Sequence, residues 1–232
     1  MSKTTFITGA NKGLGYEAAR RLSALGHTVL IGARDPRRGR RAAADLGARF
    51  VHIDVTDDAS VAAAAADVAA HEGSLDLLIN NAGIAGEMPP AEHLNGEHAS
   101  WVFNTNVIGV VRVTNAFLPL LRSSAAPAII NVTSGVGSIA LTLDPERVES
   151  QVIAPLYTAS KAAVSMLTTQ YAKAITGVRF NGVDPGHTAT DLNGNTGTQT
   201  VTEGTDAIIT LATEEPTAGT GRIIDRYGAL PW

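Results

Sequence analysis

The sequence predicts an α/β fold: a single doubly wound parallel sheet with helices on both faces. Two observations predict it. Short apolar runs alternate with longer stretches rich in alanine and leucine, and a glycine-rich turn follows the first run directly. Near-continuous apolar runs are typical of strands that are buried on both faces. Crossover helices between such strands make them parallel, and the ligand then lies at their carboxyl ends.

Six stretches are predicted as strands and five as long helices. The strands are rich in β-branched and apolar residues, and they are Thr4–Thr8, Thr28–Ile31, Arg49–Ile53, Leu75–Ile79, Ala128–Val132 and Val178–Val183. The helices consist mainly of helix-forming residues, and they are Leu14–Leu25, Arg37–Leu46, Ala59–His71, Ser100–Leu121 and Thr158–Ile175. Because no linker or internal repeat interrupts this pattern, residues 1–232 are predicted to form one domain.

One further segment is interpreted as a mobile flap over the site. Asp191–Thr205, called the flap segment below, is rich in Asn, Gly and Thr, and a short helix is expected after it near Asp206–Ala212. Segments of this composition that lie next to a site often move when a ligand binds.

Composition excludes several classes of function. The 232 residues carry a formal net charge of −4, which gives no broad basic field for binding nucleic acid. The absence of cysteine excludes disulfides, thiolate metal sites and cysteine nucleophiles, and the six histidines show no metal-ligand spacing, so no metal is expected. The N-terminal stretch has the features of neither a signal peptide nor a membrane span, so we expect a cytoplasmic protein without membrane association.

A glycine turn follows the first predicted strand and leads directly into a helix. In this context Gly9 permits a tight turn, Gly13 lets the backbone approach a pyrophosphate, and Gly15 allows close packing. Free amides and the positive helix end attract the phosphates of a dinucleotide. The alternative is an ordinary strand–helix turn, because glycines serve many turns for conformational reasons alone. The predicted cofactor contacts of this turn are Gly9, Asn11, Lys12, Gly13, Leu14 and Gly15.

The end of the second predicted strand favours NADP(H) as the cofactor. There Arg34 stands where an NAD-binding protein would have a carboxylate. Its guanidinium group can bind a 2′-phosphate through two parallel hydrogen bonds, and Lys12 supplies a second positive charge. The alternative is that Arg34 belongs to a solvated basic run and that Asp35 binds ribose, which would favour NAD(H).

Tyr157 and Lys161 are predicted to lie one helical turn apart on the same face of a helix. An ammonium group beside a phenol lowers the pKa of the phenol. Such a phenol can give a proton to a carbonyl oxygen or take one from an alcohol. Taken alone, this spacing indicates only a pair on a helix surface, because it arises often by chance.

Together these residues resemble the short-chain dehydrogenase/reductase family over essentially the whole chain. The resemblance rests on the glycine turn, Asp54-Val55, Asn80-Asn81-Ala82-Gly83, Asn106, Ser134, Tyr157, Lys161, and Pro185-Gly186 with Thr190. The glycine turn and the segment from Gly32 to Asp35 look most like the NADPH-dependent carbonyl reductase branch. The resemblance implies a Rossmann-like fold and hydride transfer between NADP(H) and a small carbonyl or alcohol substrate.

The resemblance also implies which further residues bind the cofactor. Asp54 and Val55 are expected to hold the adenine. Three residues after the fourth strand are expected to lie behind the cofactor, with ordinary turn chemistry as the alternative; they are Asn81, Ala82 and Gly83. A later loop is expected to meet the nicotinamide and its carboxamide through Pro185, Gly186, Thr188 and Thr190.

By the same resemblance, Ser134 donates a hydrogen bond to the reacting oxygen, ahead of Thr133 and Ser138. Asn106 bends a helix and supports a proton relay, and Asn104 does not carry this role. Tyr157 is the general acid/base. Lys161 lowers the pKa of Tyr157 and binds the ribose.

Two features depart from the family pattern. Ser134 and Tyr157 lie farther apart than is common, so Leu141–Gln151 is interpreted as an insertion. Asp184 stands where small or apolar residues are usual, and no role is predicted for it. Because the insertion lies near the helices that members of this family pair, a monomer, a homodimer and a higher homo-oligomer all stay open. The alternative function is a catalytically silent dinucleotide-sensing or scaffold protein, against which the intact Ser134, Tyr157 and Lys161 argue.

Overall fold

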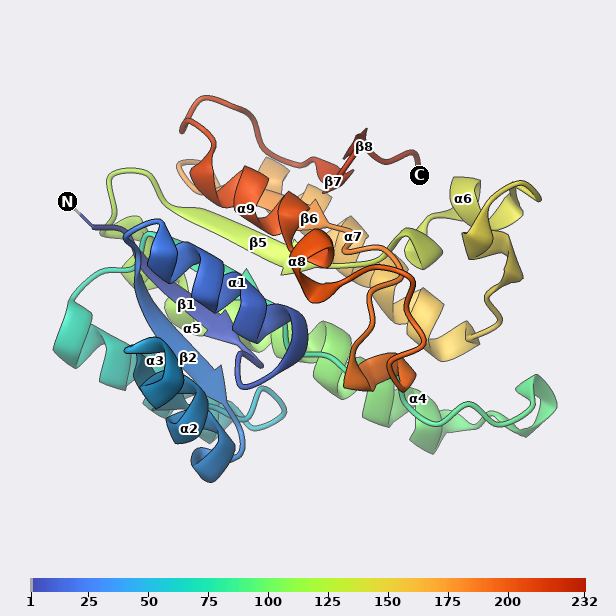
Figure 1. Cartoon of the computed structure of the whole chain (residues 1–232), viewed down its shortest axis with the longest axis horizontal. Coiled ribbons are helices and arrows are strands. Elements are labelled where there is room, and N and C mark those ends of the chain that lie inside the picture. Colours follow the sequence, from blue (N-terminus) through green and yellow to red (C-terminus); the bar gives the residue numbers. More distant parts are fainter. Residues whose placement is uncertain (1) are drawn as a thin grey trace.

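The computed structural model describes residues 2–232, and within them eight strands form one sheet in the order β3-β2-β1-β4-β5-β6-β7-β8 (Figure 1). The strands are β1 Thr4–Thr8, β2 Thr28–Ala33, β3 Arg49–His52, β4 Leu77–Asn80, β5 Ala128–Val132, β6 Arg179–Val183, β7 Ile223–Asp225 and β8 Gly228–Ala229. All neighbouring pairs are parallel except β7 and β8, which are antiparallel. The predicted doubly wound α/β sheet is confirmed, with one short antiparallel strand at its edge.

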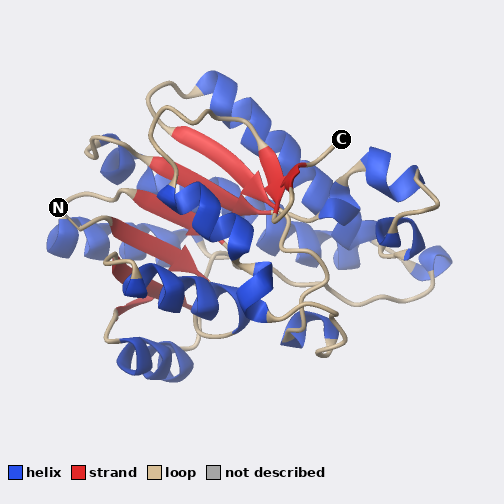
Figure 2. Ribbon diagram, turned by 45° about the horizontal axis from the view of Figure 1, so that its top comes forward, coloured by secondary structure: helices blue, strands red, loops and turns tan. Residues whose placement is uncertain are grey.

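Helices cover both faces of this sheet (Figure 2). They are α1 Gly13–Ala24, α2 Pro36–Leu46, α3 Asp58–Glu72, α4 Gly96–Phe103, α5 Gly109–Arg122, α6 Ile139–Leu143, α7 Pro155–Ala174, α8 Val201–Gly204 and α9 Asp206–Thr213. One apolar core packs α1, α2 and α9 against the sheet, and a second packs α3 and α5 against the opposite face. Within residues 2–232 no helix is long and apolar enough to cross a membrane.

The alternation of side chains along the strands explains the two cores. On β1, Ile7 points into the first core and Phe6 into the second, and both are fully buried. Phe6 stacks on Phe117 of α5, with ring centroids 4.7 Å apart. Burial of strand residues on both faces is what requires a helix layer on each side.

The strand order reverses between β1 and β4. From β1 the chain proceeds outward through β2 and β3, and from β4 it proceeds the other way through β5, β6 and β7. Ligands of open α/β sheets bind outside the carboxyl ends of the strands at this reversal point. The predicted site residues lie in the segments that follow β1, β2, β3, β4, β5 and β6, so the fold gathers them at one edge of the sheet.

The structure differs from the sequence prediction in three places. The helix expected over Ser100–Leu121 is α4 and α5 joined by a π-helical segment, Asn104–Ile108. Strands β7 and β8 were not predicted, because each is only two or three residues long. The apparent insertion contains the end of α6 and a 3₁₀ turn, Val148–Gln151.

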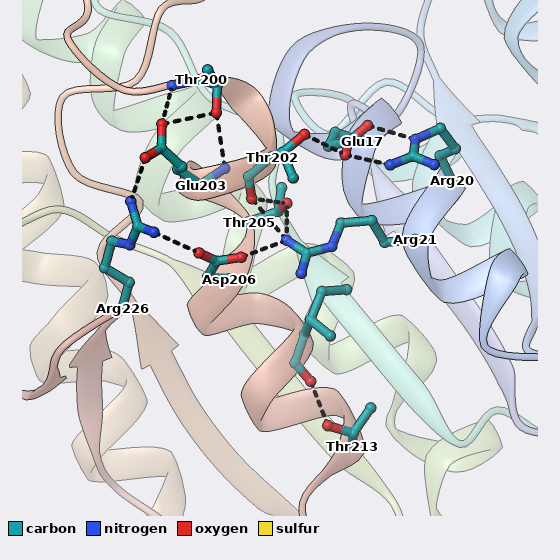
Figure 3. Close-up of polar contacts among 11 residues, drawn as sticks. Glu17, Arg20, Arg21, Thr200, Thr202, Glu203, Thr205, Asp206, Thr213 and Arg226 are labelled. Carbon is teal, nitrogen blue, oxygen red and sulfur yellow. Dashed lines mark hydrogen bonds and ion pairs between the residues drawn. The ribbon is translucent and has the colours of Figure 1, made fainter.

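The second half of the flap segment is anchored to α1 (Figure 3). The Thr202 hydroxyl donates to Glu17 at 2.9 Å. Arg21 donates to the carbonyl of Thr202 at 2.7 Å and pairs with Asp206 at 2.8 Å. These contacts hold the second part of the segment against α1, and the movement of the flap segment stays a prediction.

Candidate active site

The glycine turn after β1 adopts a backbone that favours glycine. Gly9 and Gly13 have φ angles of +66° and +57°. A Cβ placed on Gly15 would lie 2.5 Å from Asn81 Nδ2 and 2.8 Å from Gly9 O, so a side chain there would push the two turns apart. Helix α1 begins at Gly13, and within the described chain the Lys12 side chain makes no capping hydrogen bond to it. The first amides of α1 therefore suit a phosphate.

The turn after β4 is fastened to the turn after β1. Asn81 Nδ2 donates to Thr8 O at 2.8 Å. The backbone amides of Asn81 and Ala82 both donate to Thr8 Oγ1 at 3.0 Å. The Asn81 side chain thus stabilises the turn, which was the alternative to a role in cofactor binding. Gly83 lies close to two of the predicted catalytic residues, because a Cβ on it would lie 3.3 Å from Asn106 Oδ1 and 3.7 Å from Lys161 Nζ.

At the end of β2 the two candidate cofactor residues have different surroundings. Asp35 caps α2, and its Oδ1 accepts the amides of Arg37 and Arg38 at 2.9 and 3.1 Å. Hydrogen bonds from these amides, chiefly that of Arg38, lower the pKa of Asp35. Arg34 is 75% exposed, and its Nε lies 4.0 Å from Asp54 Oδ2. The carboxylate is therefore engaged by its own helix, whereas the guanidinium faces solvent.

Lys12 forms an ion pair that the sequence did not predict, and its contact with the cofactor stays a prediction. Its Nζ pairs with Asp191 of the flap segment at 2.8 Å, and both side chains are more than half exposed. The hydrogen bond and charge of Lys12, with a weaker contribution from Arg38, lower the pKa of Asp191.

Helix α7 begins at Pro155 and places Tyr157 and Lys161 one helical turn apart, as predicted. Lys161 is 6% exposed. Its Nζ donates to the carbonyl of Val132 at 2.9 Å and lies 5.6 Å from the centroid of the Tyr157 ring. The ammonium group therefore lies close to both the phenol ring and Val132, the last residue of β5. Ser134 follows two residues after Val132.

Asn106 lies in the π-helical segment and is buried. Its Oδ1 accepts the amide of Ile84 and its Nδ2 donates to the carbonyl of Ile84, both at 2.9 Å. Nδ2 also donates to Ser160 Oγ at 3.0 Å. Asn106 thus joins the helix break to the segment after Gly83 and to α7. Asn104 instead accepts a hydrogen bond from Arg112 at 2.8 Å, outside this cluster.

Of the three hydroxyl residues after β5, two are used inside the protein. Thr133 is buried and donates to the carbonyl of Lys161 at 3.0 Å. Ser138 is also buried, donates to the carbonyl of Pro231 at 2.6 Å and caps α6. Ser134 is only half-buried. The preference for Ser134 over its two neighbours agrees with these surroundings.

One electrostatic expectation is not met in this structure. Lys161 was expected to lower the pKa of Tyr157, but burial raises it, and the carboxylate of Asp184 raises it further. Burial lowers the pKa of Lys161 to about 8, against the opposing effect of Asp184. Desolvation of the phenol is therefore the main influence on its pKa.

The loop after β6 folds back onto the glycine turn. Gly186 has a φ of +66°. The hydroxyl of the buried Thr188 donates to Pro185 O at 2.8 Å, which leaves only the backbone of Thr188 to face a ligand. The Thr190 methyl group would lie 3.6 Å from a Cβ on Gly13. The Thr190 side chain thus borders the turn that is expected to hold the phosphates.

Asp54 and Val55 follow β3 at the same edge of the sheet. Asp54 Oδ1 accepts the amide and the hydroxyl of Thr56 at 2.9 and 2.7 Å, which leaves Oδ2 toward Arg34. Val55 is buried, and a Cβ on Gly109 of α5 would lie 3.1 Å from it. The two expected adenine contacts are thus held in place by neighbouring turns.

The comparison with protein families decides which family has this arrangement. The family model described as short chain dehydrogenase matches residues 3–200. The chain belongs to the short-chain dehydrogenase family. That family consists of oxidoreductases that bind nicotinamide dinucleotides, so both the oxidoreductase class and the Rossmann-like fold are established.

Similar proteins agree with this assignment. A short-chain dehydrogenase named anuI from Penicillium roqueforti is 36% identical, covering 97% of this chain and 94% of its own. A (+)-neomenthol dehydrogenase from Capsicum annuum is 30% identical, covering 89% and 90%. The crystal structure of an NADPH-bound carbonyl reductase from chicken fatty liver has a TM-score of 0.88 at 30% identity, covering 100% and 99%.

A cavity of about 250 Å³ lies beside Tyr157 of this short-chain dehydrogenase. One wall is formed after β4 by Ala85, residues 87–91 and Leu94, and the other by residues 153–157. All of these lining residues are apolar except Glu87 and Tyr157. Sequence analysis did not find the first wall, since its only signal is a loop rich in apolar residues and proline.

Proposed function

We propose that this short-chain dehydrogenase transfers a hydride between NADP(H) and a small carbonyl or alcohol substrate, with Tyr157 as general acid/base. The observation that carries the proposal is the joining of Tyr157, Lys161 and Asn106 in one cluster beside an apolar cavity. These residues come from α7 and the π-helical segment, and Gly83 brings the segment after β4 next to them.

The residues of the glycine turn fit a dinucleotide, because the Lys12 side chain does not cap α1 and the first amides of this helix are available to a phosphate. NADP(H) rather than NAD(H) is supported by the exposed Arg34 and by the engagement of Asp35 in capping α2. The likeness to an NADPH-bound carbonyl reductase supports the same choice. The cofactor contacts that we propose are Gly9, Asn11, Lys12, Gly13, Leu14, Gly15, Arg34, Asp54, Val55, Asn81, Ala82, Gly83, Tyr157, Lys161, Pro185, Gly186, Thr188 and Thr190.

When bound, the cofactor supplies or accepts the hydride. The chain's own residues manage the substrate oxygen and its proton. In reduction, Ser134 donates a hydrogen bond to the oxygen as negative charge develops, and the Tyr157 hydroxyl gives it a proton. Lys161 holds the ribose and its charge favours the phenolate that is left. Asn106 keeps the helix break against α7 and supports the proton relay that restores Tyr157.

Tyr157→Phe tests this proposal directly. The variant loses one hydroxyl, so we expect an unchanged melting temperature and nearly unchanged NADPH affinity, with kcat lower by about 10²–10⁴-fold. Turnover is followed by NADPH absorbance with a panel of aldehydes, ketones and quinones. Tyr171→Phe is the matched control, because Tyr171 lies on the same helix and packs on Phe180 with ring centroids 5.4 Å apart.

A Tyr157→Phe enzyme with near wild-type turnover on its best carbonyl substrate would refute the assigned acid/base. NADPH binding by the wild-type protein without turnover of any compound in the panel would instead favour the silent dinucleotide-sensing protein. Lys161→Ala is expected to weaken NADPH binding as well as turnover, which distinguishes the roles of the two residues.

A further inference from the structure

Asp184 is a buried carboxylate that the proposed mechanism does not use. It follows β6, precedes Pro185 and is 6% exposed. Its Oδ1 accepts the amide of Gly186 at 2.9 Å. The other carboxylate oxygen lies against the backbone of Gly135, since a Cβ on Gly135 would be only 2.7 Å from Oδ2. One side chain thus holds two separate loops.

These two loops carry different halves of the proposed reaction. Gly135 directly follows Ser134, which is assigned to the substrate oxygen. Gly186 belongs to the loop that is assigned to the nicotinamide. We propose that Asp184 is a positioning residue, whose buried carboxylate fixes the site of the substrate oxygen relative to the site of the nicotinamide. This proposal rests on the proposed function.

The charged surroundings of Asp184 show why a carboxylate differs here from a small polar residue. Glu149 from the 3₁₀ turn and Asp225 from β7 face it as like charges, and burial with these charges raises its pKa. Tyr157 and Lys161 face it from α7. When it is ionised, its negative charge opposes deprotonation of the phenol and favours the charged lysine.

The apparent insertion reaches the same point. Glu149 Oε1 would lie 3.1 Å from a Cβ on Gly135. Arg147 neutralises Glu149 through two hydrogen bonds, at 3.2 and 3.0 Å. Because Glu149 is paired in this way, Asp184 is the carboxylate whose charge acts on the reacting groups. The insertion thus packs against the joint between the two loops.

Asp184→Asn tests the proposal with a side chain of the same shape. The amide oxygen can accept from Gly186, but the NH2 group or the oxygen must then face the Gly135 backbone differently from a carboxylate, and the charge is lost. We expect hydrogen exchange to accelerate in peptides covering both loops, around Gly135 and Gly186. We also expect kcat to fall roughly 10- to 100-fold, since small misplacements of reacting groups cost about this much. In alcohol oxidation the rising limb of the pH profile should move to lower pH, because the phenol loses an opposing charge.

Asp76→Asn is the matched control. Its carboxylate also joins two segments, accepting the amide of Thr4 and the hydroxyl of Ser124, but it precedes β4 and so lies at the opposite edge of the sheet from both loops. We expect Asp76→Asn to keep its kcat within about twofold of wild type and to leave the pH profile and the exchange of both loops unchanged. A purely structural role of Asp184 would lower the melting temperature of Asp184→Asn without moving its pH profile.

The outcomes separate this proposal from the proposed function. If the wild-type protein reduces carbonyls but Asp184→Asn keeps its kcat, pH profile and loop exchange, the role of Asp184 is wrong and the function stands. If the wild-type protein turns over no carbonyl, the function is wrong, and the exchange data still decide whether Asp184 joins the loops. Faster hydrogen exchange of both loops in Asp184→Asn supports the role of Asp184 in holding them together, and unchanged exchange overturns it.

Discussion

Replacing Asn106 by alanine removes the side chain that connects the π-helical segment to the rest of the site. Three hydrogen bonds are lost, two to the backbone of Ile84 and one to Ser160. Asn106 itself is 2% exposed, so water does not replace them without rearrangement. We expect both the stability and the turnover of the protein to fall.

The magnitude follows from the bonds. A hydrogen bond contributes about 1 kcal/mol net, and more when a buried partner is left unpaired, so the variant should lose about 3 kcal/mol of unfolding free energy. For a protein of this size, 1 kcal/mol shifts the melting temperature by about 2–4 °C. The expected decrease for Asn106→Ala is therefore about 6–12 °C.

Thermal unfolding monitored by circular dichroism measures this decrease, with Asn104→Ala as the control. Asn104 lies in the same π-helical segment but makes one hydrogen bond, from Arg112, which keeps its ion pair with Asp58 at 2.8 Å. Asn104→Ala should lose no more than about 1 kcal/mol and keep its turnover. Equal melting temperatures for the two variants would contradict the reasoning, because the burial and the bonds of Asn106 would then contribute nothing.

Two further predictions concern charge. Arg34→Asp should shift the preference from NADPH toward NADH, since it removes the phosphate-binding group, and Arg41→Asp in the same basic run should not; an equal NADPH/NADH ratio of kcat/KM in wild type and Arg34→Asp would favour the solvated-run interpretation. Lys161 titrates at about pH 8 in the folded protein and near 10.4 when unfolded, so its burial destabilises the fold fully below pH 8 and less as the pH rises. Lys161→Met lacks this buried charge, so we expect it to be more stable than wild type at pH 7 and to lose that advantage as the pH rises. Urea unfolding at pH 7, 8 and 9 measures the difference in unfolding free energy between the two proteins, and a difference that does not change with pH would disprove the lowered pKa.

Much of the fold could be predicted because its signals are local. Strands β1 and β5 lie where the apolar runs predict them. Helix α2 has proline in its first turn and Gly47 after its end, with a φ of +62°, which are ordinary start and stop signals. The π-helical segment has no such local signal, and only the family resemblance led us to expect a helix bend at Asn106. Its sequence is compatible with a continuous helix, and the long-range bonds of Asn106 accompany the break.

The residues of the candidate site were easier to predict from the sequence than the contacts that they make. A motif position identifies Lys12, whereas Asp184 was noted only as a departure from the family pattern, and the neighbours of both residues come from remote parts of the chain. Lys12 pairs with Asp191, 179 positions later. Asp184 lies against Gly135 because β5 and β6 are neighbours in the sheet, which brings the loops after them together. Such pairings depend on the tertiary fold, so no local pattern reveals them.

The raised pKa of Tyr157 shows how the tertiary fold changes a role that was predicted from spacing. The spacing of Tyr157 and Lys161 predicts an acidic phenol, whereas burial and Asp184 together keep the proton on it. For the proposed reduction this is no obstacle, because the alkoxide that forms on a substrate is a far stronger base than a phenolate and takes the proton even from a weakly acidic phenol. In alcohol oxidation the same environment works against the enzyme, since Tyr157 must first lose its proton. We therefore expect the pH profile of alcohol oxidation to rise toward high pH and that of carbonyl reduction to be level near neutral pH.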